Sequence, residues 1–173
     1  LRLFVALARR EEDLAAPLRR LAAAPSLDWF MARLRQHLAQ DEQALLYELS
    51  VYAGPAPRST RRKDQKVLHS LADLGLVEMS SPETVGLHPA VQSWLYQQLP
   101  LDRRAELHLA AATELAERSQ LTAAAYHYIQ AGQPELALWT WYHHRQEEIE
   151  QGQGRAALEM FAPLLQTALA DPE

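Results

Sequence analysis

The chain has 173 residues, of which 48% are hydrophobic, and it carries a formal net charge of -5. These values are enough for one or two folded domains with a buried core, and they exclude a disordered chain. The sequence contains no cysteine, which excludes a disulfide framework and a thiolate metal site. It also has no signal-peptide pattern and no apolar run of about 18 to 20 residues, so we expect a cytoplasmic protein without a membrane-spanning segment.

The charge is unevenly distributed between the two parts of the chain. Residues 1–100 carry 12 Lys and Arg against 11 Asp and Glu, whereas residues 101–173 carry 5 against 11. An acidic second part is poorly suited to hold nucleic acid. The chain begins at Leu1, inside an apolar helical pattern, so we expect it to be a piece of a longer protein.

The first part of the chain alternates helical patterns with strong breaks. The spacing of apolar residues predicts helices over residues 1–24 and 61–74, and another that is capped by Ser26 or Asp28 and runs to about Gln40. One more helix is capped by Asp41 and ends at Gly54. Residues 76–79 and 84–88 alternate as two strands, and the polar turn between them predicts a β-hairpin. A further helix is expected to start at Pro89. Three helices followed by a hairpin predict a winged-helix domain over residues 26–100.

The second part, residues 101–173, contains only helical patterns. These predict helices over residues 102–118, 121–131, 134–150 and 155–170, joined by Gly-bearing or polar turns. Glu114-Leu115 followed by Ala123 recurs as Glu148-Ile149 followed by Ala157, an offset of 34, and tetratricopeptide repeats have a period of about 34 residues. The expected fold class is therefore mainly α: a winged-helix domain with a small β-hairpin, followed by tetratricopeptide-like antiparallel helix pairs.

Four stretches of sequence resemble one known family. They are Gln43 to Gly54 (QALLYELSVYAG), Leu71 to Glu78 (LADLGLVE), Leu87 to Val91 (LHPAV) and Ala125 to Tyr128 (AYHY) followed by Ala131-Gly132. Their order is similar to that in the signal-transduction ATPases with numerous domains, the STAND class. That class includes the plant resistance proteins of the NB-ARC type and the large maltose-activator-like bacterial regulators.

The resemblance implies a different role for each of three parts of the chain. Residues 1–25 would be the end of a helical lid, residues 26–100 a winged helix that switches with nucleotide state, and residues 101–173 the first repeats of a sensor. ADP or ATP would be bound by an upstream ATPase domain, so this fragment would need no cofactor of its own. The implied partners are that upstream domain, a sensed ligand or protein, and further copies on activation.

His88 is the residue to which the resemblance gives a role. The family carries a Met-His-Asp motif at the end of its hairpin, and the matching positions here are Leu87, His88 and Pro89, so the Asp is absent. The resemblance implies that His88 contacts the β-phosphate of ADP, and an imidazole N–H can donate a hydrogen bond to a phosphate oxygen. The alternative is that His88 only caps the helix that begins at Pro89 or packs under the hairpin.

A basic cluster supports a different function. Five cations lie at the entrance of the helix that DNA-binding winged helices insert into the major groove: Arg58, Arg61, Arg62, Lys63 and Lys66. Against this hypothesis, the expected wing contains Glu83 and no cation, and Glu78 lies on the hairpin. A winged-helix transcriptional regulator with a helical ligand-binding or protein-binding domain therefore remains the alternative function.

The histidines and glycines do not form a catalytic or metal-binding pattern. His143 and His144 are adjacent, hence about 100° apart on a helix, and no His-Glu-x-x-His motif occurs. The glycines form neither a phosphate-binding loop nor a dinucleotide fingerprint. We therefore expect no metal site and no enzymatic activity in this fragment, with ATPase chemistry lying upstream.

Aromatic residues gather in the acidic part of the chain. Trp139 and Tyr142 share a helix face, whereas Trp141 points elsewhere. Such a group usually packs between repeats, but an exposed member would mark a partner surface or the place of further downstream repeats. The candidates for that surface are Trp141 and Tyr126.

Overall fold

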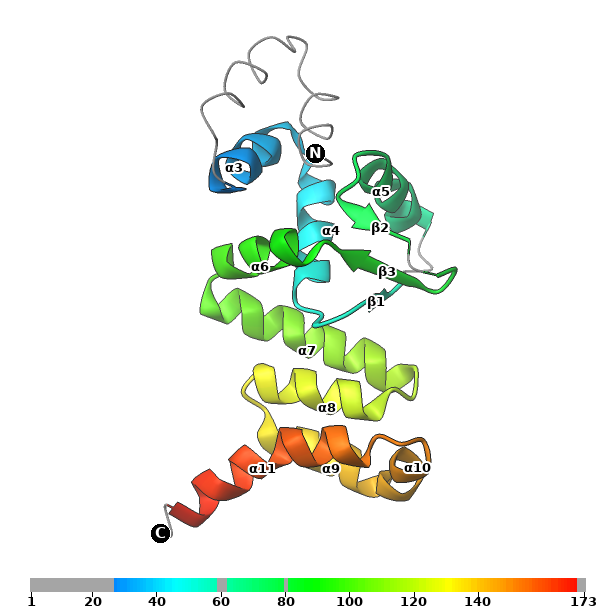
Figure 1. Cartoon of the computed structure of the whole chain (residues 1–173), viewed down its shortest axis with the longest axis vertical. Coiled ribbons are helices and arrows are strands. Elements are labelled where there is room, and N and C mark those ends of the chain that lie inside the picture. Colours follow the sequence, from blue (N-terminus) through cyan, green and yellow to red (C-terminus); the bar gives the residue numbers. More distant parts are fainter. Residues whose placement is uncertain (1–26, 59–61, 80, 171–173) are drawn as a thin grey trace. The chain divides into compact units, whose positions relative to one another are not determined.

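The computed structural model describes residues 27–58, 62–79 and 81–170, which belong to two compact units, Leu1–Leu99 and Pro100–Glu173 (Figure 1). The helix expected over residues 1–24 and the lid assigned to residues 1–25 lie outside the described residues. None of the described helices is long and apolar enough to cross a membrane.

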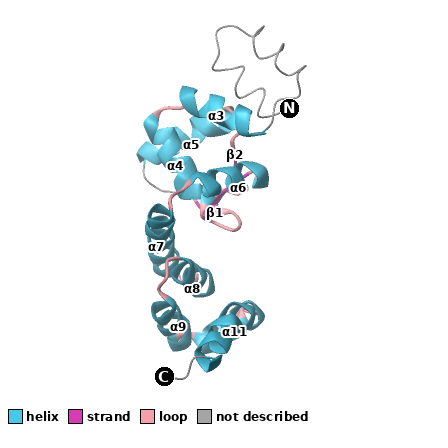
Figure 2. Ribbon diagram, turned by 90° about the vertical axis from the view of Figure 1, so that its left-hand side faces the viewer, coloured by secondary structure: helices cyan, strands magenta, loops and turns pink. Residues whose placement is uncertain are grey.

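The first unit combines helices with a small sheet (Figures 1 and 2). Its elements are α3 (Leu27–His37), α4 (Gln40–Ser50), β1 (Ala56–Pro57), α5 (Arg62–Asp73), β2 (Val77–Glu78), β3 (Thr84–Leu87) and α6 (Pro89–Gln98). The sheet has the order β1-β3-β2 and is antiparallel throughout. Val85 pairs with Ala56 on one side of β3, and Leu87 pairs with Val77 on the other.

The third strand is a difference from the predicted two-stranded hairpin. β1 spans only Ala56 and Pro57, which is too short for an alternating pattern to be visible in the sequence. Proline is tolerated there because β1 is an edge strand, where a missing N–H need not break a ladder. The chain pairs again just beyond β1, where the N–H of Arg58 donates to the backbone oxygen of Glu83 at 2.7 Å.

The core of the first unit follows the helical periodicity of its sequence. α4 packs against α5 and α6, and α3 packs against α6. The large apolar side chains at the centre are at most 1% exposed: Leu34, Leu46, Leu68, Leu71, Leu76, Val85 and Val91. Burial of this kind contributes about 1.5 to 3 kcal/mol for each large side chain, so these residues hold the sheet against the helices.

A buried carboxylate ties α4 to α5. Glu42 is 4% exposed, and its carboxylate accepts hydrogen bonds from Ser70 Oγ at 2.6 Å and from the N–H of Ala39 at 2.9 Å. Ala39, not Asp41, is the residue that precedes α4. The prediction that Asp41 caps this helix is therefore wrong. The helix instead begins after Ala39, whose N–H donates to the side chain of Glu42.

The second unit consists of stacked helices (Figures 1 and 2). They are α7 (Leu101–Glu117), α8 (Leu121–Gln130), α9 (Pro134–His143), α10 (Arg145–Glu150) and α11 (Gly154–Ala170). α7 packs along α8, α8 packs along α9, and α11 contacts α8 and α10. The single helix predicted over residues 134–150 is broken at His144, whose φ of -116° departs from helical geometry.

The second unit repeats itself with a period of 33 residues. Ser119 (φ 58°) and Gly152 (φ 83°) take the same left-handed conformation after α7 and α10. At the same offset, Ala124 and Ala157 are 0% and 2% exposed, and small residues at such positions let helices approach closely. The offset of 34 predicted from the sequence is one residue too long, since it matches Glu114, which is partly exposed, with the buried Glu148.

Candidate functional site

His88 lies at the junction between β3 and α6 and is exposed. Its Nδ1 atom accepts a hydrogen bond from the N–H of Ala90 at 3.3 Å, so the side chain caps α6. Pro89 occupies the first turn of α6, where its missing N–H removes no hydrogen bond. The helix-capping interpretation of His88 is thus present in the structure.

The capping bond uses Nδ1 of His88 and leaves its Nε2 able to form a second hydrogen bond. A neutral imidazole that accepts at Nδ1 carries its proton on Nε2, which is then a hydrogen-bond donor. The ring also lies at the N-terminus of a helix, where the backbone dipoles favour an anion. The capping role and contact with a phosphate are therefore compatible at this residue.

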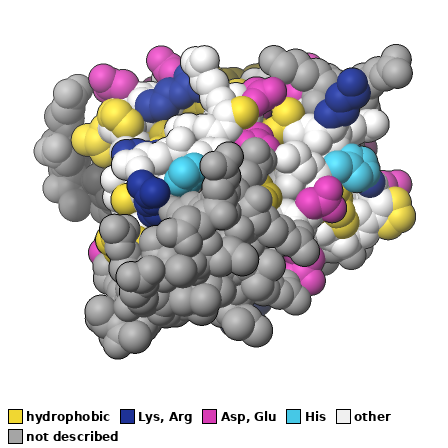
Figure 3. Space-filling model, turned by 90° about the horizontal axis from the view of Figure 1, so that it is seen from above, with side chains coloured by type: hydrophobic (Ala, Val, Ile, Leu, Met, Phe, Trp, Pro, Cys, Tyr) yellow, Lys and Arg dark blue, Asp and Glu magenta, His cyan; other side chains and the backbone are white. Residues whose placement is uncertain are grey.

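The basic cluster is only partly described. Arg61 lies outside the described residues, and the side chains of Arg62 and Lys63 are not described either. Of the other two members, Lys66 is exposed on α5 and Arg58 is half-buried beside β1. On the face seen in Figure 3, the Lys and Arg side chains that are drawn in colour are interspersed with Asp and Glu, so the described residues form no continuous cationic surface there.

Two histidines form a buried pair between α7 and α8. His108 and His127 are 1% and 3% exposed, and their Nδ1 atoms lie 2.9 Å apart. Burial and the nearby Arg104 lower the pKa of His108, while burial and His108 lower the pKa of His127 to about 4. The described residues contain no group of three or more His, Cys, Asp or Glu side chains able to hold a metal ion. Because both pKa values are lowered, the two rings are neutral at neutral pH and share a buried hydrogen bond.

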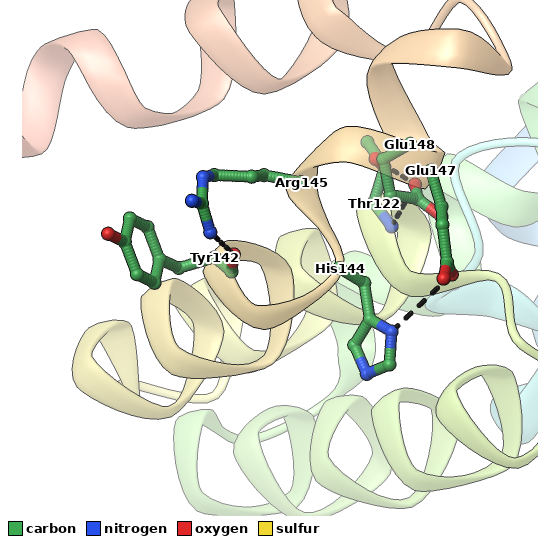
Figure 4. Close-up of polar contacts among 6 residues, drawn as sticks. All are labelled: Thr122, Tyr142, His144, Arg145, Glu147 and Glu148. Atoms are coloured by element: carbon green, nitrogen blue, oxygen red, sulfur yellow. Dashed lines mark hydrogen bonds and ion pairs between the residues drawn. The ribbon is translucent and has the colours of Figure 1, made fainter.

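A second buried polar cluster joins α8 to α9 and α10, and Figure 4 shows its Thr122 and Glu148. Glu148 is 3% exposed, and its carboxylate accepts hydrogen bonds from the N–H of Thr122 at 3.0 Å and from Thr122 Oγ1 at 2.5 Å. The same Oγ1 accepts a hydrogen bond from Trp141 Nε1 at 3.0 Å. Trp141 is half-buried, because this bond holds the indole nitrogen toward α8. Its assignment to a partner surface stays a prediction.

Among the described aromatic residues, the most exposed are Trp139 and Tyr142, at 62% and 53%. Together with Leu138, which is 52% exposed, they form one face of α9. Arg145 lies over the Tyr142 ring at 4.3 Å and donates a hydrogen bond to the Tyr142 backbone oxygen (Figure 4). We call Leu138, Trp139 and Tyr142 the α9 face. Tyr126, the other predicted partner residue, is 37% exposed on α8.

The spacing of residues along α9 indicates which of them can share the α9 face. Ala137 and Thr140 are buried toward the neighbouring helix, so residues 138, 139 and 142 lie on the opposite side. Helical spacing in the sequence puts Trp139 and Tyr142 on one face, whereas the predicted partner residues are Trp141 and Tyr126. Which side of α9 is covered depends on its packing against α8, which a single sequence does not reveal.

The fold belongs to the mainly helical class, with a small antiparallel sheet in the first unit and stacked helices in the second. It is similar to the crystal structure of a STAND protein with a tetratricopeptide repeat sensor from Pyrococcus horikoshii, with a TM-score of 0.66 and 19% sequence identity. The match covers 95% of this chain and 25% of that one, so this chain spans about a quarter of its length. At this identity the likeness shows a shared fold. No family model and no curated protein match the sequence.

Proposed function

We propose that this chain is the switch-and-sensor part of a STAND-type signalling ATPase and has no catalytic activity of its own. The observation that carries the proposal is the similarity in fold over 95% of the chain to a STAND protein that has a tetratricopeptide repeat sensor. In this proposal the first unit acts as a winged helix beside an upstream ATPase domain. The second unit is the start of a helical sensor.

The proposed switch residue is His88. Its Nδ1 is occupied by the Ala90 N–H, so the exposed ring offers Nε2–H to a β-phosphate of ADP held by the upstream domain. A sensed ligand or protein that favours the open arrangement of the domains would remove this contact and permit nucleotide exchange. The exposed α9 face is the surface we assign to that ligand or protein, because contiguous exposed apolar side chains mark interaction sites.

The test separates the capping role of His88 from the phosphate contact. In the longer protein that includes the ATPase domain, His88→Asp keeps a good helix cap but replaces the N–H donor by a negative charge. We expect unchanged folding and at least about tenfold faster loss of bound ADP, because a hydrogen bond to a charged group is removed. His69→Ala, at an exposed histidine of α5, is the control. Unchanged ADP retention in His88→Asp would remove the assigned role.

A further inference from the structure

A carboxylate lies on the same exposed side of α9 as the α9 face. Glu135 precedes Leu138 by three residues and Trp139 by four, so these side chains are neighbours on one side of the helix. Glu135 is exposed, and among the described residues no hydrogen bond or ion pair joins its carboxylate to another group. The α9 face therefore has a negative charge at its N-terminal end.

A following repeat does not cover this side of the helix. With the period of 33 residues, Trp139 and Tyr142 correspond to Glu106 and Leu109 of α7. The helices of the second repeat, α9 to α11, follow α7 and α8 in the stack. Even so, the Glu106 side chain is 64% exposed and Leu109 is 43% exposed. The stacking of repeats thus leaves this side of a helix open to a partner.

Both aromatic rings of the α9 face are held in place by neighbours. Arg145 lies over the Tyr142 ring (Figure 4) and donates a hydrogen bond to the Tyr142 backbone oxygen. His143 lies against Trp139, with ring centroids 4.6 Å apart, and its Nδ1 is 2.8 Å from the Trp139 backbone oxygen. An aromatic ring face attracts a cation. The described residues supply a guanidinium to Tyr142 and no Lys or Arg side chain to Trp139.

The charge of Glu135 decides which kind of partner the surface can take. An apolar partner would remove this carboxylate from water without a cation to pair with it, which is costly. A second copy that docked through the same face would bring two such carboxylates into one contact. An anionic partner would be repelled by Glu135 and by the whole unit, which has 11 Asp and Glu against 5 Lys and Arg. A cationic partner meets none of these objections.

The arrangement of the side chains favours a guanidinium over an ammonium group. A guanidinium is planar, stacks on aromatic rings and can donate two parallel hydrogen bonds to a carboxylate. The Cβ atoms of Glu135 and Trp139 are one helical turn apart, roughly 5–6 Å, so a group stacked on the indole can reach the carboxylate. The methylene stem of an arginine can pack along Leu138.

From these observations we propose that Glu135 and the α9 face bind an arginine side chain of a protein partner. The guanidinium stacks on Trp139 and pairs with Glu135. The inference rests on the proposed function only for the consequence of binding, namely release of ADP by the longer protein. Binding itself needs only this chain.

A short capped peptide with two arginines is the probe for the intact chain. One matched peptide carries citrulline, which keeps the shape of arginine without its charge, and another carries lysine. We expect saturable binding at millimolar or lower concentration, roughly the range of a small contact, with a shift of the Trp139 indole N–H signal in NMR spectra. Binding should be at least about fivefold weaker for citrulline and threefold weaker for lysine. An unshifted Trp139 signal, or equal affinity for any two of the three peptides, would overturn the proposal.

Three variants locate the contact, with the affinity read from the anisotropy of the labelled arginine peptide. Glu135→Gln and Trp139→Leu should each weaken binding by at least about threefold. Both side chains are exposed, so the variants should fold, which circular dichroism checks. Glu117→Gln removes the same charge from an exposed position of α7 and should keep the affinity. An equal loss in Glu117→Gln and Glu135→Gln would show attraction by the acidic unit as a whole and would refute the site.

The longer protein separates this proposal from the proposed function. If the arginine peptide binds but leaves ADP release unchanged, the sensing role fails and the arginine site stands. If His88→Asp speeds the loss of ADP while no peptide binds, the arginine site fails and the switch role stands. We expect the peptide to speed the loss of ADP in the unsubstituted protein and to have no such effect in Trp139→Leu.

Discussion

His108 and His127 meet with their Nδ1 atoms 2.9 Å apart in the buried interface between α7 and α8. In the neutral pair, the Nδ1–H of one ring donates a hydrogen bond to the unprotonated Nδ1 of the other. At the offset of 33 residues their counterparts are Trp141 and Met160, and Trp141 packs against Phe161 with ring centroids 5.9 Å apart. The first repeat thus has two titratable side chains at these positions, whereas the second repeat has none.

The buried pair makes the stability of the second unit dependent on pH. Burial, followed by His108, lowers the pKa of His127 to about 4, whereas an unfolded chain protonates histidine near pH 6.5. The unfolded state therefore binds more protons between these values, and the free energy of unfolding falls as the pH drops from about 6.5 to 4, by on the order of 3 kcal/mol. Above about pH 6.5 this histidine contributes no pH dependence.

Urea denaturation at several pH values measures this slope, and His127→Gln should flatten it. Glutamine can keep a hydrogen bond to His108 but cannot titrate. His143→Gln changes an exposed histidine and should leave the slope as it is. An equal slope in the His127→Gln variant would contradict the assignment.

Removing the carboxylate of Glu148 should loosen the second unit. Glu148→Ala leaves the N–H and the hydroxyl of Thr122 without the acceptor that they use, and a buried unsatisfied donor costs about 1 to 3 kcal/mol. Glu148→Gln keeps one oxygen acceptor and should cost less than Glu148→Ala. Chemical denaturation followed by tryptophan fluorescence reports the change. A control at the exposed Glu147, Glu147→Ala, should be close to neutral.

A double-mutant cycle on Glu42 and Ser70 should show coupling in the first unit. The Ser70 hydroxyl donates to the buried Glu42 carboxylate at 2.6 Å. We expect Glu42→Ala to cost about 2 kcal/mol and Ser70→Ala about 1 kcal/mol, with the double variant less destabilised than their sum. Strict additivity of the two free-energy changes would show that this bond does not link α4 to α5.

The intact chain should bind duplex DNA negligibly. Affinity for duplex requires several phosphates to be neutralised, and it falls steeply with salt. Glu78 and Glu83 are exposed beside the sheet, where they would oppose a phosphate backbone. Fluorescence anisotropy with labelled duplex at two salt concentrations checks this prediction. Salt-sensitive binding that is lost in Lys66→Glu would instead favour the transcriptional-regulator alternative.

The mainly helical fold with a small antiparallel sheet follows from the sequence. Apolar residues such as Leu68 and Leu71 recur at helical spacing, and the alternation around Val77 and Val85 marks two strands. β1 and the break at His144 were missed, since neither has a local signature: one is a two-residue strand defined only by its pairing, and the other follows no Gly or Pro. Elements made by tertiary contact are invisible to periodicity.

Some features of the candidate site residues could be predicted from local sequence, whereas others depend on tertiary contacts. The position of His88 before a helix that starts with Pro89 could be read from the sequence, but its capping bond to Ala90 fixes the tautomer and is visible only in coordinates. His108 and His127 lie within the helices predicted over residues 102–118 and 121–131. Their direct contact depends on the register between α7 and α8, which residues 19 positions apart in sequence do not specify.

Ser119 and Gly152 close equivalent turns, yet only Ser119 has a Cβ atom. A non-glycine residue at φ 58° is strained by about 1 kcal/mol relative to glycine. The turn after α7 is therefore strained at Ser119, whereas the turn after α10, which has Gly152 at this position, is not. Exchanging Ser119 for glycine would release this strain and raise the melting temperature of the helical stack without touching any helix, His88 or the exposed aromatic residues.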